Sequence, residues 1–136
     1  MKPRHVNMLK IEIASAALAY EVFKPLRDLE VEELWTLALS PSLKLLEAEM
    51  IFRGTVGTCL VHPREIFRFA LLSNASSIII AHNHPSQENL PSDPDIQMTK
   101  NLILVGQVIE IPLLDHLLIT RYGYSSFREK AWCTFT

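Results

Sequence analysis

The spacing of apolar residues along the chain predicts helices and strands that are mixed without strict alternation. Apolar residues recur about every 3.6 positions over residues 5–24, which predicts an amphipathic helix that ends before Pro25. Two further apolar runs, at residues 29–40 and 43–53, are separated by the turn-forming segment Ser40-Pro41-Ser42. These two runs predict a pair of strands joined as a β-hairpin.

The middle of the chain also predicts both strands and helices. A short β-branched run at residues 56–61 predicts a strand, and His62-Pro63 predicts the start of a helix because proline suits the first helical turn. The run Ile78-Ile79-Ile80 predicts a buried strand that leads to a pair of histidines. Periodic apolar residues then predict a helix from Ser92 to Gly106.

The last part of the chain predicts short strands and one short helix. Apolar residues at 108–114 and 117–119 indicate late strands, and Pro112 indicates a sheet edge or a bulge. The spacing Ser126-x-x-Glu129 predicts a capped final helix. The predicted fold class is therefore α/β in the broad sense (α+β), a mixed β-sheet flanked by helices.

Composition narrows the class of protein without assigning a function. The chain has 136 residues, of which 49% are hydrophobic and 21% charged, as expected for one soluble globular domain. A net charge of −2 with scattered lysines and arginines gives no clear nucleic-acid patch. Cys59 and Cys133 form no Cys-x-x-Cys pair and no apolar run is as long as a membrane span, so a reduced, cytoplasmic chain without a membrane partner is predicted.

Two histidines and a carboxylate near the middle of the chain have the pattern of a metal site. Side chains alternate along a strand, so His82 and His84 are expected to point to the same side. The spacing Ser92-x-x-Asp95 predicts a capping box that opens the next helix and directs Asp95 back toward the histidines. Two imidazoles and one carboxylate form a three-ligand set for zinc that leaves a fourth position for water. Asp93 offers similar chemistry, and composition alone does not choose between the two aspartates.

These residues carry a resemblance to a known family. The spacing His82-x-His84, seven residues, Ser92-x-x-Asp95 resembles the JAMM signature of MPN-domain zinc metallopeptidases. The segment His82-Asn83-His84-Pro85-Ser86, together with Pro91-Ser92, is similar to the RadC family in particular. Further similar blocks are Gly54-Thr55, Val61-His62-Pro63-Arg64-Glu65 and Leu114-Asp115-His116, and the resemblance runs from about Val31 to Trp132. Gln87 departs from it, because RadC proteins usually carry glycine at that place.

The resemblance implies both a fold and a set of roles. It implies the MPN or JAB fold, a cytidine-deaminase-like arrangement, over residues 30–136, after an N-terminal helical segment at residues 1–29. It implies a Zn²⁺ ion held by His82, His84 and Asp95. It also implies that Ser92, besides capping its helix, donates a hydrogen bond to the oxyanion that forms during amide hydrolysis.

The general base is also implied by the resemblance. JAMM enzymes carry it well upstream, in the pattern of a glutamate, four residues and an apolar residue, which Glu32 and Leu37 fit. Glu33 is the nearest alternative, and strand alternation would turn the two side chains to opposite faces. Glu47 and Glu49 have suitable chemistry without support from the family pattern.

The sequence therefore predicts a zinc-dependent hydrolase that cleaves amide bonds, peptide or isopeptide, in a peptide or protein substrate. One alternative is a RadC-type protein that acts on nucleic acid in DNA repair. A second alternative is a metal-binding MPN scaffold without catalysis. Asp115-His116 is compatible with a second metal site or a triad, but a hydrogen bond that supports the first site is the simpler interpretation. The oligomeric state stays open.

Overall fold

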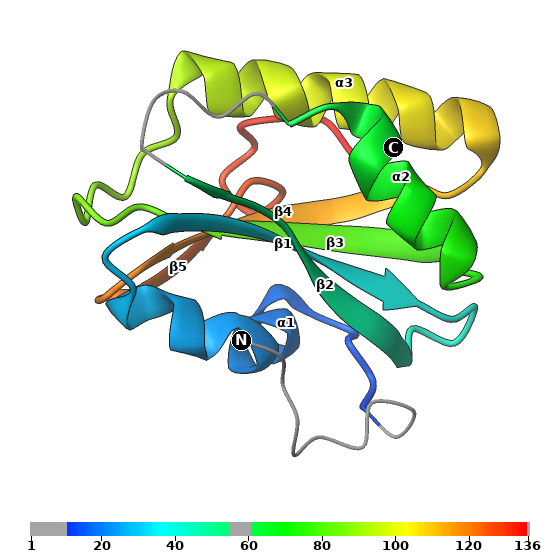
Figure 1. Ribbon diagram of the computed structural model, residues 1–136, viewed down its shortest axis with the longest axis horizontal. Coiled ribbons are helices and arrows are strands. Elements are labelled where there is room, and N and C mark those ends of the chain that lie inside the picture. Colours follow the sequence, from blue (N-terminus) through cyan, green and yellow to red (C-terminus); the bar gives the residue numbers. More distant parts are fainter. Residues whose placement is uncertain (1–10, 55–60, 136) are drawn as a thin grey trace.

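The computed structural model describes residues 11–54 and 61–135, which form a sheet with helices on both faces. The strands are β1 (Glu32–Leu39), β2 (Leu45–Gly54), β3 (Ser77–Asn83), β4 (Leu113–Thr120) and β5 (Gly123–Ser126). The helices are α1 (Ala16–Phe23), α2 (Pro63–Leu72) and α3 (Asp93–Ile109), with a 3₁₀ segment, η2 (Lys24–Asp28), after α1. Helices α2 and α3 cover one face of the sheet and α1 lies against the other (Figure 1).

The sheet is mixed, as predicted. Its strand order is β2-β1-β3-β4-β5, and the only parallel pair within the described residues is β3 with β4. Parallel neighbours need a long crossover connection, and α3 supplies it between these two strands. The predicted α/β class, a mixed sheet flanked by helices, is confirmed.

Alternation along the central strands divides the hydrophobic core into two layers. Ile78 and Ile80 pack beneath α2 and α3, whereas Ile79 and Ala81 pack toward α1. All residues of β1 and β3 are buried, which explains their nearly continuous apolar runs. A residue's parity on these strands therefore decides which layer its side chain enters.

The first helix is shorter than predicted. Ile13 donates its backbone N–H to the carbonyl of Leu43, and Glu12 forms a β-bridge with Lys44, so this segment is extended. The helix begins only after Ser15, whose side chain accepts a hydrogen bond from the backbone N–H of Leu18. The prediction was wrong for residues 11–15 because pairing with a distant segment overrides the helical spacing, and residues 5–10 lie outside the described residues.

The predicted late strands differ from the observed ones. Helix α3 continues to Ile109, where a strand was expected, and ends at Glu110 in the left-handed conformation (φ 60°). The remaining apolar residues form the single strand β4, which lies inside the sheet. Pro112 comes just before this strand, and a register shift between Ile78 and Ile79 leaves Leu114 without a partner on β3. The edge interpretation of Pro112 was therefore wrong, and the bulge interpretation stays a prediction because the shift lies beyond Pro112.

Two other predictions have mixed outcomes. The strand expected at 56–61 lies outside the described residues except for Val61, which is not in a strand. The final helix is instead a series of turns, although Ser126 Oγ does accept the N–H of Glu129 at 3.0 Å. Strand β5 was not predicted. Within the described residues, no helix combines the length and the apolar character needed to cross a membrane.

Replacing Gly106 with alanine should destabilise the protein, although alanine normally favours a helix over glycine by about 1 kcal/mol. A Cβ atom at Gly106 would lie 2.7 Å from the carbonyl oxygen of Ile111, which is backbone and cannot move aside easily. We expect urea denaturation to show a loss of about 1–3 kcal/mol in the free energy of unfolding. Val108→Ala, at a position 82% exposed on the same helix, is the control and should change it by less than about 0.5 kcal/mol. A Gly106→Ala variant as stable as the parent would contradict the close approach.

Candidate metal centre

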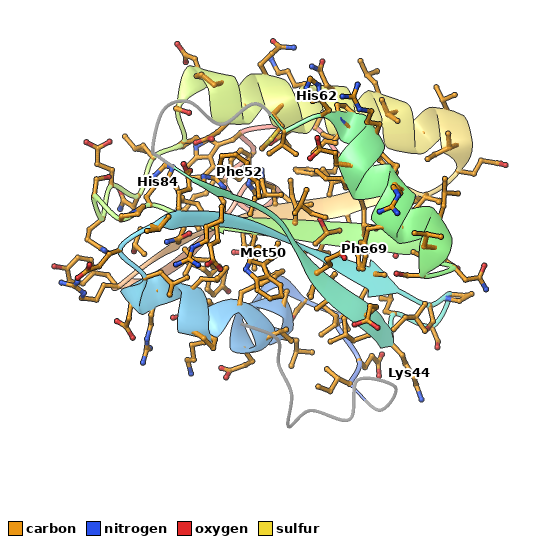
Figure 2. All side chains as sticks on the ribbon, viewed as in Figure 1. Lys44, Met50, Phe52, His62, Phe69 and His84 are labelled. Atoms are coloured by element: carbon orange, nitrogen blue, oxygen red, sulfur yellow. The ribbon has the colours of Figure 1, made fainter. Side chains whose placement is uncertain are left out.

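Three elements bring the candidate residues together at one end of the sheet. In the antiparallel pair of β1 and β3, Leu34 lies opposite His82, so the start of β1 is next to the end of β3. His84 follows that end directly, and Figure 2 shows it at the opposite end of the sheet from Lys44. Helix α3 begins above the same end of the sheet (Figure 1), and the Asp95 carboxylate in its first turn lies within 3.3 Å of both histidine rings.

The side chains of Glu32, His82, His84 and Asp95 form one cluster. One nitrogen or oxygen atom from each lies within 4.8 Å of the others. The two histidine Nε2 atoms are 3.0 Å apart, and Asp95 Oδ2 lies 3.3 Å from His82 Nε2 and 3.2 Å from His84 Nε2. Ligand atoms that converge in this way can hold a metal ion at their centre.

Strand parity separates the two neighbouring glutamates. Glu32 faces the cluster, whereas Glu33 faces the α1 side, where its carboxylate accepts a hydrogen bond from Trp35 Nε1 and pairs with Arg53. Both are 5% exposed, so burial does not distinguish them. Of the other carboxylates considered from the sequence, Asp93 is exposed and outside the cluster, and Glu47 and Glu49 line a separate groove between β2 and α2.

Asn83 holds the backbone on both sides of Glu32. Its side-chain oxygen accepts the N–H of Glu33 at 2.7 Å, and its side-chain nitrogen donates to the carbonyl of Val31 at 3.0 Å. Asn83 lies between the two histidines on the strand, so it points to the opposite face and is free to make these contacts. Sequence reasoning missed this role, although the single residue between two candidate ligands was the available signal.

The surroundings of the cluster shift the pKa values of its carboxylates in opposite directions. Burial raises the pKa of the Glu32 carboxyl, and the attraction of His82 offsets only part of that effect. Burial would also raise the pKa of the Asp95 carboxyl, but the close approach of the His82 and His84 rings and the backbone N–H of Ser92 outweigh it and hold this pKa far below its usual range. The surroundings thus favour the charged form of the Asp95 carboxyl and disfavour the charged form of the Glu32 carboxyl.

The predicted capping box is present and fixes the Asp95 carboxylate. Ser92 Oγ accepts the N–H of Asp95 at 3.1 Å, and the N–H of Ser92 donates to Asp95 Oδ2 at 2.9 Å. The same oxygen faces both histidines. Asp95 therefore both caps the start of α3 and belongs to the cluster. The two roles that the sequence suggested for it, helix cap and metal ligand, are compatible.

Asp115 and His116 have separate structural roles. The Asp115 carboxylate accepts hydrogen bonds from the backbone of His116 and Arg128 and from the hydroxyl of Ser126, so it organises the turns after β5. The His116 ring lies 2.6 Å from His82, through its Nε2 and His82 Nδ1. Neither residue belongs to a second metal-binding group among the described residues.

Comparison with known families identifies the domain. The family described as the RadC-like JAB domain matches residues 13–132. The chain belongs to this family. Its sheet and helices have the JAB or MPN arrangement that the resemblance implied, and JAB domains as a group include metallopeptidases.

Individual relatives in the RadC family bear uninformative names. A UPF0758 protein of Symbiobacterium thermophilum is 35% identical over 126 residues, which cover 92% of this chain and 54% of the relative. One of Thermotoga maritima is 33% identical, with 93% and 57% covered, and one of Thermosynechococcus vestitus is 47% identical, with 72% and 39% covered. The chain thus spans about half the length of the curated relatives it matches.

The loop after the histidines accommodates the residue that departs from the RadC pattern. Gln87 has a φ of 67°, in the left-handed region, which costs a non-glycine residue roughly 1–2 kcal/mol. Its side chain offsets that cost, because Oε1 accepts the N–H of Arg121 at 2.6 Å and Nε2 donates to the carbonyl of Pro85 at 3.2 Å. These hydrogen bonds tie this loop to the β4–β5 turn.

A pocket of about 240 Å³ opens over the cluster. All four cluster residues line it, together with Ser92. Part of its wall is apolar and comes from Leu34, Leu90 and Met98. The cluster is thus accessible to a small substrate group rather than sealed in the core.

Proposed function

We propose that this RadC-family domain is a zinc-dependent hydrolase that cleaves amide bonds in peptides or proteins. The observation that supports it is the convergence of His82, His84 and Asp95 beside Glu32 in an open pocket. A metal site with three protein ligands and a solvent-accessible fourth position is typical of catalytic rather than structural zinc.

The donor set fits zinc in both chemistry and spacing. Imidazole nitrogens and a carboxylate oxygen are zinc ligands, and tetrahedral bonds of about 2.0–2.2 Å place neighbouring ligand atoms about 3.3–3.6 Å apart. The three separations in the cluster are 3.0, 3.2 and 3.3 Å, close to that range. When bound, zinc would supply Lewis acidity and lower the pKa of water at the site toward about 7.

Glu32 is the proposed general base. Its carboxylate is buried beside the three donors, and burial raises its pKa toward the range in which a base works well near neutral pH. It takes a proton from the attacking water and gives that proton to the leaving nitrogen. Asn83 keeps the backbone around Glu32 in place during this exchange.

Ser92→Ala should lower the rate of hydrolysis by about 10²–10³-fold, because the proposed oxyanion donor is lost. The same change removes the cap of α3 and costs about 1 kcal/mol of stability, so a control must separate the two effects. Ser15 caps α1, on the opposite face of the sheet from α3, and Ser15→Ala should cost similar stability with unchanged kcat. Equal kcat in both variants would contradict the role of Ser92.

The proposed function is tested by direct cleavage. The full chain, loaded with one zinc per molecule as verified by elemental analysis, is incubated with a synthetic peptide library and with isopeptide-linked peptides, and products are identified by mass spectrometry. We expect new amino groups that appear only with zinc bound. A zinc-loaded chain that cleaves neither kind of substrate would overturn the proposal and favour a scaffold that binds metal without catalysis.

A further inference from the structure

A chain of hydrogen bonds runs from His82 away from the pocket and returns to Asp95. His82 Nδ1 lies 2.6 Å from His116 Nε2, and His116 Nδ1 lies 2.7 Å from Thr99 Oγ1. The Thr99 hydroxyl donates to the backbone carbonyl of Asp95 at 2.7 Å. His116 and Thr99 are each 0% exposed, so bulk water does not compete for these contacts.

The direction of every hydrogen bond in this chain follows from its last member. A carbonyl oxygen only accepts, so the single hydroxyl proton of Thr99 points to Asp95 and its oxygen must accept from His116 Nδ1–H. A neutral imidazole with a proton on Nδ1 has a lone pair on Nε2, so His116 accepts from His82 Nδ1–H.

His116 is held as a neutral ring. It is fully buried and stacks on Phe127, with ring centroids 4.0 Å apart and planes inclined by 9°. Its two nitrogens contact a ring nitrogen and a hydroxyl, neither of which is an anion. A charged imidazole in such a place would bear a large desolvation cost.

We infer that His116 and Thr99 are positioning residues that fix the tautomer of His82, so that its Nε2 lone pair faces His84 and Asp95. His84 reaches the same state by a simpler route, because its Nδ1 donates directly to the carbonyl of Glu88 at 3.0 Å. His82 has another ring as its neighbour, which can either donate or accept, and therefore needs two further residues to set the direction.

This chain of hydrogen bonds forms a relay that also joins three elements of the fold at the candidate metal centre. His82 is on β3, His116 on β4 and Thr99 on α3, and Asp95 contributes its carbonyl to the relay and its carboxylate to the cluster. The orientation of His82 is thereby coupled to the position of the first turns of α3. The consequence for metal affinity rests on the proposed function, whereas the tautomer itself does not.

The tautomer is measured directly by long-range ¹H–¹⁵N NMR of the histidine rings, in the 136-residue chain treated with a chelator. We expect both His82 and His116 to carry their proton on Nδ1. A proton on Nε2 of His82 in the parent protein would overturn the inference, whatever the protein's activity.

Thr99→Val tests the relay, because it removes the hydroxyl and keeps the shape of the side chain. We expect a mixture of tautomers at His82 and a Zn²⁺ affinity that is about 10–100-fold weaker in a competition titration. Thr99→Ser should restore both readouts. Thr36→Val is the matched control, because Thr36 is also buried and its hydroxyl has no hydrogen-bond partner among the described residues.

An unchanged His82 tautomer in Thr99→Val would overturn the inference even if zinc affinity fell. If the parent chain binds no zinc, the proposed function fails while the NMR result still decides the tautomer. If Thr99→Val does not fold, the parent spectrum and Thr99→Ser remain, and a mixed tautomer in either of them would count against the relay.

Discussion

His84→Ala should abolish stoichiometric zinc binding. The substitution removes one of three donor atoms that lie within 3.3 Å of one another, and the two that remain leave most of the coordination positions to water. The loss of zinc affinity should exceed the roughly 100-fold loss expected at most when only a residue that supports a ligand is removed. It is measured by elemental analysis after dialysis against a metal-buffered solution.

His62→Ala is the control for this prediction. His62 is exposed at the start of α2, its side chain makes no capping hydrogen bond, and it lies outside the cluster. Its replacement should leave zinc content unchanged. Equal zinc in the His84→Ala variant and in the parent would remove His84 from the proposed ligand set.

Glu32→Gln should retain zinc and lose hydrolysis by about 10²–10⁴-fold in kcat. Glutamine has nearly the shape of glutamate, so the three proposed ligands are not disturbed, but an amide cannot take and return a proton. Single-turnover rates and zinc content are measured on the same samples, so that loss of chemistry is distinguished from loss of metal.

Glu33→Gln is the matched control, since the two glutamates are neighbours with equal burial. Its carboxylate contacts Trp35 and Arg53 on the other face of β1, so this variant should lose some stability and keep its kcat. An inactive Glu33→Gln beside an active Glu32→Gln would reverse the assignment of the base.

The sequence predicted best those features that depend on local pattern. The isoleucine run gave β3, the spacing His82-x-His84 gave two side chains on one face, and Ser92-x-x-Asp95 gave the capping box. Each of these follows from backbone geometry within a few residues. The grouping of Glu32 with the histidines came from a family pattern, and strand parity explains why its neighbour is excluded.

The features that the sequence did not reveal depend on contacts between distant segments. Asn83 acts on a strand 50 residues away, and His116 acts on a ring 34 residues away. Strand β5 is short and only partly buried, so it lacks an apolar signal and exists because it pairs with β4. Residues 11–13 have helical spacing but pair with residues 43–45 instead.

The alternation of side chains on β1 has a consequence for how this family can change over time. Insertions at Pro41 and Ser42, which are exposed, would be absorbed at the surface without shifting the phase of the strand. A single residue inserted between Glu33 and Leu34 would instead exchange the two glutamates between faces. The chain can therefore be lengthened at the turn end of this strand, whereas the end at the candidate metal centre needs a fixed count of residues.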